Sequence, residues 1–481
     1  MEFLRENWWI VLLAAILIAF LLYCILRARR LRRRTVELSE PTTDPALRER
    51  AAESLSQMIR FRTIAQEESE EEFRQQNFYI RERYPLTCAH LQVSTVDGQG
   101  LLCRWPGADE SLRPILFCAH MDVVPAGQGW THDAFGGERE NGYIYGRGAL
   151  DCKGPAVALL EAIESLLAQG FSPRRDVYFS IGHDEETGRK EGATRVAQYF
   201  EKQNIEFEMV LDEGDYVQRA SAWIDQPAAF VDVAEKGVLT MRVTAHAPGG
   251  HASHPGARTC AAELAEAISR IEQAKFRPRV SRTTRAFFRE LAPYMKTSEK
   301  FLYANSWIFK RAFIRTMCKN SYRNAILRTT AAVTMVYGGK APNILPEKME
   351  AVVSIRLLQG QTSQDVIKFY SLLLQGCDVE LNIDLDGEPS AESDASGHYY
   401  KTLCRCIREK FGTVPVIPAL SPSASDGRRY ERVAHQVYSF VPLALEPEEL
   451  AAMHGPEERM PEAELGRAVE FYRDFIRELQ N

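Results

Sequence analysis

Apolar and polar residues follow two periods along this chain, one typical of strands and one typical of helices. Short apolar runs bounded by turn residues predict strands at 101–105, 114–119, 177–181, 209–211, 238–244, 330–337, 349–357, 379–383 and 437–441. Apolar residues at helical spacing predict helices at 45–58, from Gly154 to Gly170, at 261–271 and at 462–479. Strands and helices interleave, which predicts an α/β fold.

The longest apolar run lies near the N-terminus. Residues 8–26 are apolar or aromatic, with Tyr23 and Cys24 as partial exceptions, and this length just crosses a hydrocarbon core of ~30 Å. A cleavable signal peptide is the alternative, but the run is long and no Ala-x-Ala-like site follows it. Arginines follow at once: Arg27, Arg29, Arg30, Arg32, Arg33 and Arg34. By the positive-inside rule we expect 1–35 to be a single-pass membrane anchor with a basic flank, 36–46 a linker, and the body of the chain cytoplasmic.

Composition excludes some classes of protein. The chain has 481 residues, 45% of them hydrophobic and 26% charged, and a net charge of -6, which suits two or more globular domains. Its mild acidity and scattered Lys and Arg do not favour nucleic-acid binding. The ten Cys show no disulfide-framework spacing, so we expect free thiols in a reducing compartment.

Acidic and imidazole side chains gather in four short stretches between 115 and 214. They are His120 and Asp122, Asp151, the pair Glu185-Glu186, and the pair Asp212-Glu213. In three of the four, an apolar run ends directly before them, and strand ends in an open α/β sheet meet at one edge. Each acid alone is more often a cap or turn residue. Together they would repel one another without a cation, and oxygen-plus-imidazole donors favour Zn, Mn or Co.

These stretches resemble the aminoacylase/carboxypeptidase S family of co-catalytic zinc exopeptidases, which includes the N-fatty-acyl-amino-acid hydrolases. The resemblance covers about residues 45 to 481. It implies a mixed-sheet di-zinc catalytic domain in two parts, 47–235 and 386–481. An inserted α+β lid and dimerisation domain would occupy 236–385, and a homodimer would form through that lid.

The resemblance also implies roles by position. The metal ligands would be His120, Asp151, Glu186, Asp212 and His454, with two zinc ions per subunit. Asp151 would bridge the metals, Asp122 would orient His120, and Glu185 would be the general base. Asp212 is preferred to Glu213 because it directly follows the apolar run. The family commonly has Asn where Glu457 stands, which is a departure close to His454.

Further roles fall in the predicted lid. His251, in a Gly-Gly-His turn, would stabilise the oxyanion in the partner subunit's active site, the alternative being an ordinary loop histidine. Asn343 and Arg356 would bind the substrate, since a guanidinium matches a carboxylate in shape. A basic and aromatic segment at 276–328 would shape an apolar pocket, rest on the membrane, or pack as an ordinary helical face.

The predicted function is zinc-dependent hydrolysis of the amide bond to a C-terminal amino acid, in a peptide or an N-acyl amino acid. Two alternatives remain at this stage. A dipeptidase of the same family would differ in pocket shape. A membrane-anchored, non-catalytic binding protein on this fold would tolerate loss of ligands, whereas the ligand set here is intact.

Overall fold

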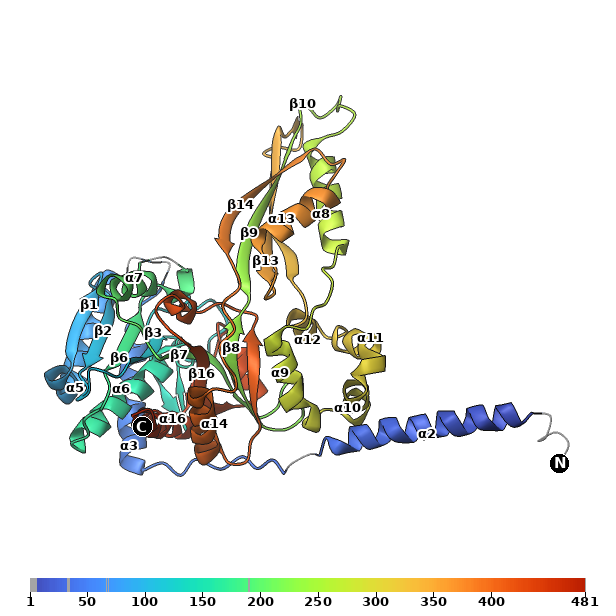
Figure 1. Ribbon diagram of the computed structural model, residues 1–481. Helices are drawn as coiled ribbons and strands as arrows, with labels where there is room; N and C mark the ends of the chain where they lie inside the picture. Colours follow the sequence, from blue (N-terminus) through green and yellow to red (C-terminus); the bar gives the residue numbers. More distant parts are fainter. Residues whose placement is uncertain (1–6, 33–34, 66, 68, 189–190, 481) are drawn as a thin grey trace.

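A mixed sheet of eight strands forms the centre of the molecule in the computed structural model, which describes residues 7–32, 35–65, 67, 69–188 and 191–480 (Figure 1). Arg33 and Arg34 of the predicted basic flank lie outside the described residues. In spatial order the strands are β1 (Gln92–Val96), β2 (Gly100–Trp105), β6 (Val177–Gly182), β3 (Ile115–His120), β7 (Met209–Gln218), β16 (Val437–Leu445), β8 (Ala228–Glu235) and β15 (Val416–Ser421).

Four neighbouring strands of this sheet run in the same direction. β3 is parallel to β6 and β7, and β16 is parallel to β7, whereas β1 and β2 continue the sheet antiparallel. The carboxyl ends of β6, β3 and β7 therefore share one edge of the sheet. β3 and β6 are buried along their whole length, as expected for strands covered on both faces. The sheet confirms the predicted mixed α/β fold.

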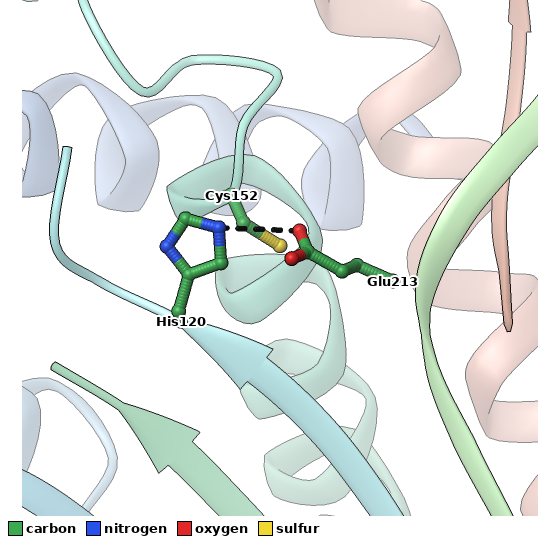
Figure 2. Close-up of side chains that lie close together, drawn as sticks. All are labelled: His120, Cys152 and Glu213. Atoms are coloured by element: carbon green, nitrogen blue, oxygen red, sulfur yellow. Dashed lines mark ion pairs between the residues drawn. The ribbon is translucent and has the colours of Figure 1, made fainter. Parts of the chain in front are cut away.

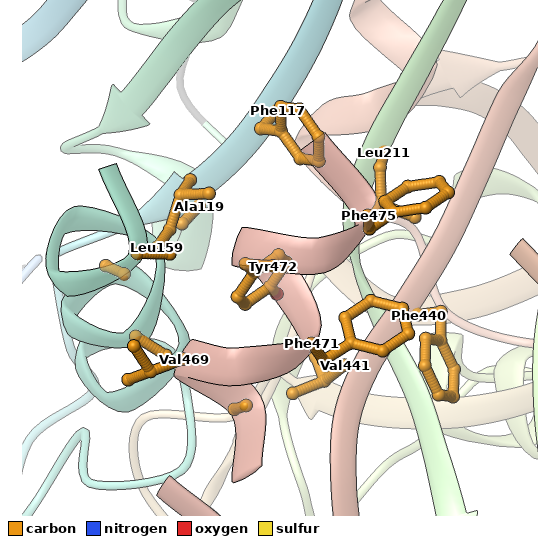
Figure 3. Packing of buried hydrophobic residues seen from close by; sticks show 14 of the residues in the cluster. Phe117, Ala119, Leu159, Leu211, Phe440, Val441, Val469, Phe471, Tyr472 and Phe475 are labelled. Atoms are coloured by element: carbon orange, nitrogen blue, oxygen red, sulfur yellow. The ribbon is translucent and has the colours of Figure 1, made fainter. Parts of the chain in front are cut away.

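Helices cover both faces of the sheet. One face carries α3 (Pro45–Ile59), α6 (Lys153–Ala168), α14 (His398–Phe411) and α16 (Glu462–Glu478). Figure 3 shows part of this core, where Phe117 of β3 meets Phe475 of α16 with ring centres 6.1 Å apart. On the other face, α7 (Ala193–Gln203) inserts Phe200 against Phe207 and Tyr178. α4 (Glu70–Arg83) and α5 (Pro85–His90) precede the sheet.

A second sheet stands away from the first (Figure 1). Its strands, in order, are β11 (Thr330–Tyr337), β13 (Lys348–Leu357), β9 (Gly237–His246) and β14 (Val379–Gly387), all antiparallel. α8 (Cys260–Gln273) and α13 (Ser363–Leu373) pack on it around a core of their own. At the far end, β10 (Gly250–His251) pairs antiparallel with β12 (Ile344–Leu345). This unit falls in the range predicted for the inserted domain.

A helical insertion separates α8 from β11. It consists of α9 (Arg282–Leu291), the short turn Ala292–Tyr294, α10 (Thr297–Ala304), α11 (Ser306–Met317) and α12 (Ser321–Ala325). Although these residues lie within the predicted lid range of 236–385, they pack elsewhere. Phe287 and Phe288 share a core with Ile417 and Leu420 of β15, so the insertion covers the edge strand of the first sheet.

α2 (Trp8–Arg30) runs out from the body of the molecule beside α10 (Figure 1). Among the described residues it is the one helix long and apolar enough to cross a membrane, with a mean hydropathy of 3.0 over its most apolar window. A signal sequence near the N-terminus has the same properties.

Candidate metal centre

The shared edge of β3, β6 and β7 carries the acidic and imidazole side chains. His120 ends β3 and lies opposite Gly182, the last residue of β6. Glu185 and Glu186 follow in a single helical turn, Glu185–Thr187. Asp151 lies two residues before α6 begins, and His454 follows α15 (Pro447–Ala452). Topology therefore brings these side chains together from segments that are distant in the sequence.

The carboxylate of Asp151 lies between two imidazoles. Its Oδ1 is 3.0 Å from Nε2 of His120, and its Oδ2 is 3.0 Å from Nε2 of His454. Each imidazole also faces a second carboxylate. Nε2 of His120 is 3.2 Å from Oε2 of Glu213, and Nε2 of His454 is 3.2 Å from Oε1 of Glu186. The arrangement has two halves that share Asp151.

Glu213, and not Asp212, lies at this centre. Figure 2 shows the Glu213 carboxylate facing His120, with the Cys152 thiol beside both. Asp212 instead accepts a hydrogen bond from the Gly427 backbone N–H at 2.5 Å. The strand was expected to end at Leu211, but β7 continues to Gln218. Because neighbouring side chains in a strand point to opposite faces, only one of the two acids faces His120.

Asp122 supports the centre from behind and is completely buried. His120 Nδ1 lies 2.9 Å from the backbone oxygen of Asp122 and 3.3 Å from its Oδ1. The same carboxylate accepts the backbone N–H groups of Glu185 and Glu186 at 3.3 and 2.9 Å. Asp122 thus fixes the ring of His120 and the turn that presents both glutamates.

A buried ion pair that sequence reasoning missed joins the Asp151 loop to the His454 loop. Glu458 accepts the backbone N–H groups of Leu150 and Asp151 at 2.9 and 3.2 Å and pairs with Arg147 Nη1 at 2.5 Å. Arg147 also donates to the backbone oxygen of Gly455 at 3.0 Å. β17 (Arg459–Pro461) follows Glu458 and pairs with β5 (Tyr143–Tyr145), which in turn pairs with β4 (Arg139–Glu140). The sequence did hold a signal for this pair, since Glu458 lies four residues after the predicted ligand His454 and Arg147 lies in the Gly-rich turn before Asp151.

The unusual residue beside Glu458 has a different task. Glu457 accepts the backbone N–H of Thr131 at 2.6 Å and lies 2.7 Å from Nδ1 of His132. His132 stacks on Tyr145 with ring centres 3.8 Å apart. Both residues therefore stabilise the loop that precedes Asp151, and His132 takes no part in the metal centre.

The electrostatics of the centre call for a cation. Burial, followed by the charge of Glu213, raises the pKa of Glu185 to about 11. Burial alone would lower the pKa of His120, but the carboxylates of Glu213, Asp122 and Asp151 raise it well above its ordinary value. Oε1 of Glu186 is buried and has the imidazole of His454 as its ion-pair partner. Crowded buried carboxylates and two imidazoles fit divalent metal ions with nitrogen and oxygen ligands.

The centre lines a cavity of about 530 Å³. Asp151, Glu185, Glu186, Glu213 and His454 form one wall, and the other includes Asp215, Asp232, Leu450, Met453 and Tyr322 of the helical insertion. A larger hollow of about 840 Å³ between β1, β2 and α7 contains none of the predicted site residues.

The predicted lid residues lie outside this cavity. His251 of β10 and Asn343, next to β12, are exposed, and Ala252 N–H donates to the Asn343 backbone oxygen at 3.0 Å. β10 lies at the end of the second sheet that is far from the first (Figure 1). Arg356 is half-buried on β13, opposite Val238 of β9. Burial and then the charge of Arg428 lower its pKa, so two guanidinium groups face the same region. Within one chain, none of the three residues reaches the metal centre.

Comparison with known proteins places this geometry in context. The profile described as peptidase family M20/M25/M40 matches residues 116–478. The Dictyostelium discoideum protein named "Probable carboxypeptidase S-like 2" is 32% identical over 438 residues, covering 89% of this chain and 84% of that protein. The Xenopus tropicalis protein named "N-fatty-acyl-amino acid synthase/hydrolase PM20D1" is 32% identical over 440 residues, covering 89% and 86%. The crystal structure of the M20 family metallo-carboxypeptidase Sso-CP2 from Sulfolobus solfataricus shares the fold, with a TM-score of 0.67 at 19% identity over 89% of this chain and 99% of that one.

Proposed function

Because this chain belongs to peptidase family M20/M25/M40 and is a metal-dependent hydrolase of peptide or amide bonds, we propose that it cleaves the amide bond to a C-terminal amino acid. The observation that carries the proposal is the Asp151 carboxylate, held between the Nε2 atoms of His120 and His454. A carboxylate with one oxygen toward each half of a site is suited to bridging two metal ions.

The metal ligands in this proposal are His120, Asp151, Glu186, Glu213 and His454. Glu213 takes the place first given to Asp212, because only Glu213 faces His120. The donor set favours two zinc ions per subunit, with Mn or Co as alternatives. When bound, such ions lower the pKa of water and polarise a carbonyl group. Asp122 keeps His120 in place through the contact at Nδ1.

Glu185 is the proposed general base. It lines the cavity, and its backbone is held by Asp122 at 3.3 Å. Its carboxylate takes a proton from the attacking water and returns it to the leaving amine. Bound cations next to Glu185 would lower its raised pKa toward neutral, where a carboxylate can both take and return a proton.

The test is Glu185→Gln. We expect this variant to bind metal like the wild type, since the amide replaces a group outside the ligand set, and to lose about 100- to 10,000-fold in kcat. Metal content is measured by elemental analysis and turnover by amine release. Glu191→Gln, at an exposed position of the same loop, is the control and should keep full activity. Normal turnover by Glu185→Gln would show that Glu185 is not the general base.

We further propose that His251 and Asn343 act on the active site of a second subunit, because their own chain holds both far from its metal centre. Arg356, beside Arg428, is proposed to hold the free carboxylate of the substrate. The outer strand β14 of the second sheet is largely exposed, which supports a homodimer through this unit.

Mixed dimers test this arrangement. Glu185→Gln and His251→Ala should each be inactive alone. After random subunit exchange in an equal mixture, half of the dimers are mixed and each holds one complete site, so we expect about a quarter of wild-type activity. A mixture as inactive as its components would contradict the action of His251 on a second subunit, and full activity of His251→Ala alone would place His251 outside the reaction.

The substrate we propose is an N-acyl amino acid, and dipeptides are the alternative. The names of the relatives support the acyl substrate, and Tyr322, Leu450 and Met453 give the cavity an apolar side. A screen of dipeptides, acetyl-amino acids and long-chain acyl-amino acids, read by amine release, distinguishes the two. Preference for unblocked dipeptides would overturn the choice of substrate and leave the metal centre intact.

Residues 8–26 are proposed to anchor the chain in a membrane, with the catalytic body on the cytoplasmic side. The support is the length and hydropathy of α2 and the basic residues Arg27, Arg29 and Arg30 in its last turn.

A further inference from the structure

The helical insertion is fixed to the C-terminal third of α2. Asn305, which is completely buried, donates from Nδ2 to the backbone oxygen of Cys24 at 3.0 Å. Cys24 is the one buried residue among those described in α2. Nε of Arg27 donates to the backbone oxygen of Ala304 at 3.1 Å. These contacts fix the position of α10 and α11 relative to the anchor.

The same contacts set the depth of an exposed apolar pair. The ring of Trp307 lies against Phe20, with ring centres 6.2 Å apart, and Phe20 precedes Arg27 by seven residues, or about 10 Å along a helix. Arg27 marks the end of the apolar run, so Trp307 lies beside the part of α2 that would be inside the bilayer. Trp307 and Ile308 are 58% and 51% exposed. At this depth both apolar side chains would contact lipid acyl chains.

Basic residues continue this surface toward the body of the protein. Lys310 and Arg311 of α11 are exposed. Between the end of α2 and the catalytic domain lies a cavity of about 590 Å³, lined by Arg30, Arg32 and Arg408. Glu290 is the one acid in its lining, and Arg289 pairs with that acid at 3.0 Å. Such a cavity suits a phosphate group carried by a lipid at the end of the anchor.

We propose that the surface formed by Trp307, Ile308 and the cavity of Arg30, Arg32 and Arg408, which we name the docking face, rests on an anionic bilayer. The inference builds on the proposed membrane anchor and adds a second contact with the same membrane. Trp307 and Ile308 enter the acyl-chain region beside α2, and the arginine cavity takes the headgroup of an acidic phospholipid. Tyr322, later in the same insertion, lines the catalytic cavity, so docking places that cavity close to the membrane surface.

Photo-crosslinking of the full chain in vesicles tests the proposal. A photoreactive phenylalanine analogue replaces Trp307 in one variant and Phe78 of α4, an equally exposed aromatic residue at 61%, in a control. Vesicles contain phosphatidylcholine alone or mixed with phosphatidylglycerol. We expect lipid adducts at 307 and none above background at 78. Hydrolysis of a short soluble substrate shows that both variants are folded.

The arginine cavity is tested separately. Arg408→Gln should lower the lipid adduct at 307 about fivefold in vesicles with phosphatidylglycerol and leave it unchanged in phosphatidylcholine alone. Lys401→Gln removes the same charge from an exposed position of the same helix outside the cavity, and it should change neither yield. Equal yields for Arg408→Gln and the wild type in both vesicles would overturn the acidic headgroup site.

A carbonate wash before crosslinking separates the anchor from the docking face. A chain that stays with the vesicles and forms lipid adducts at 307 supports both. Release of the chain into the wash would contradict both the membrane anchor and the docking that builds on it. A retained chain with no lipid adduct at 307, or with an adduct to a second copy of the protein, leaves the anchor standing and overturns docking.

Discussion

The pair Glu457 and Glu458 shows how adjacent side chains of one type take opposite tasks. Glu458 is completely buried and holds both the Asp151 loop and Arg147, whereas Glu457 lies at the surface beside His132. Breaking a buried ion pair leaves an uncompensated charge. We therefore expect Glu458→Gln to lower the free energy of unfolding by about 3–5 kcal/mol.

Glu457→Gln is the matched change, and its cost should stay below about 1 kcal/mol because its partner is partly exposed. Urea unfolding of the metal-loaded protein measures both. Equal losses in the two variants would contradict the structural role of Glu458.

At the residue scale the sequence was informative where a strand ended at an acid or an imidazole. His120 and the Glu185-Glu186 pair were predicted this way, whereas Asp151 follows a Gly-rich turn and was assigned from the family resemblance. The choice between Asp212 and Glu213 failed because it depends on where β7 ends, and its apolar run stops seven residues before the strand does. Arg147 and Glu458 were missed because a buried ion pair has no apolar pattern of its own.

At the scale of elements, Lys236 connects the two sheets to the insertion. It is completely buried, and its Nζ donates to the backbone oxygens of Ala325 and Arg328 at 3.0 and 2.9 Å. Burial and then the charge of Arg356 lower the pKa of Lys236 to about 7, against 10.5 for an ordinary lysine. Between these values the unfolded chain binds more protons than the folded chain, so this residue makes stability rise with pH.

Lys236→Met should remove that contribution. In the wild type we expect Lys236 to raise the free energy of unfolding by at most about 3 kcal/mol between pH 7 and pH 9. The urea midpoint at both pH values, compared between wild type and variant, measures the slope. A variant with the same increase from pH 7 to pH 9 as the wild type would assign the pH dependence to other groups.

The sequence predicted most of the strands and the long helices, because their periodicity is strong. It did not show where the helices of 282–325 pack. Their apolar faces would suit either sheet, and only the structure shows that Phe287 and Phe288 cover β15. The position of His251, far from the metal centre of its own chain, was likewise beyond any local pattern.

For the whole molecule, the separate hydrophobic cores of the two sheets predict that the two units unfold at different temperatures. The second sheet with α8 and α13 has its own buried cluster, whereas the metal centre lies on the first sheet. Bound metal stabilises by about 4 kcal/mol when its free concentration is about 1,000 times Kd. This corresponds to about 8–16 °C in Tm for a domain of this class.

We therefore expect two thermal transitions in calorimetry, of which only one falls when a chelator removes the metal. Restored metal should restore that transition. A single transition, or an equal shift of both, would show that the two units unfold together.

The position of β16 between β7 and β8 also determines when the first sheet can be completed during synthesis. Residues 8–30 and β7 leave the ribosome long before β16 and His454 are made. Until then the first sheet has a gap beside β7, and the metal centre lacks one of its two imidazoles. The nascent chain is therefore inert as an enzyme until β16 and His454 have been added to the folded sheet.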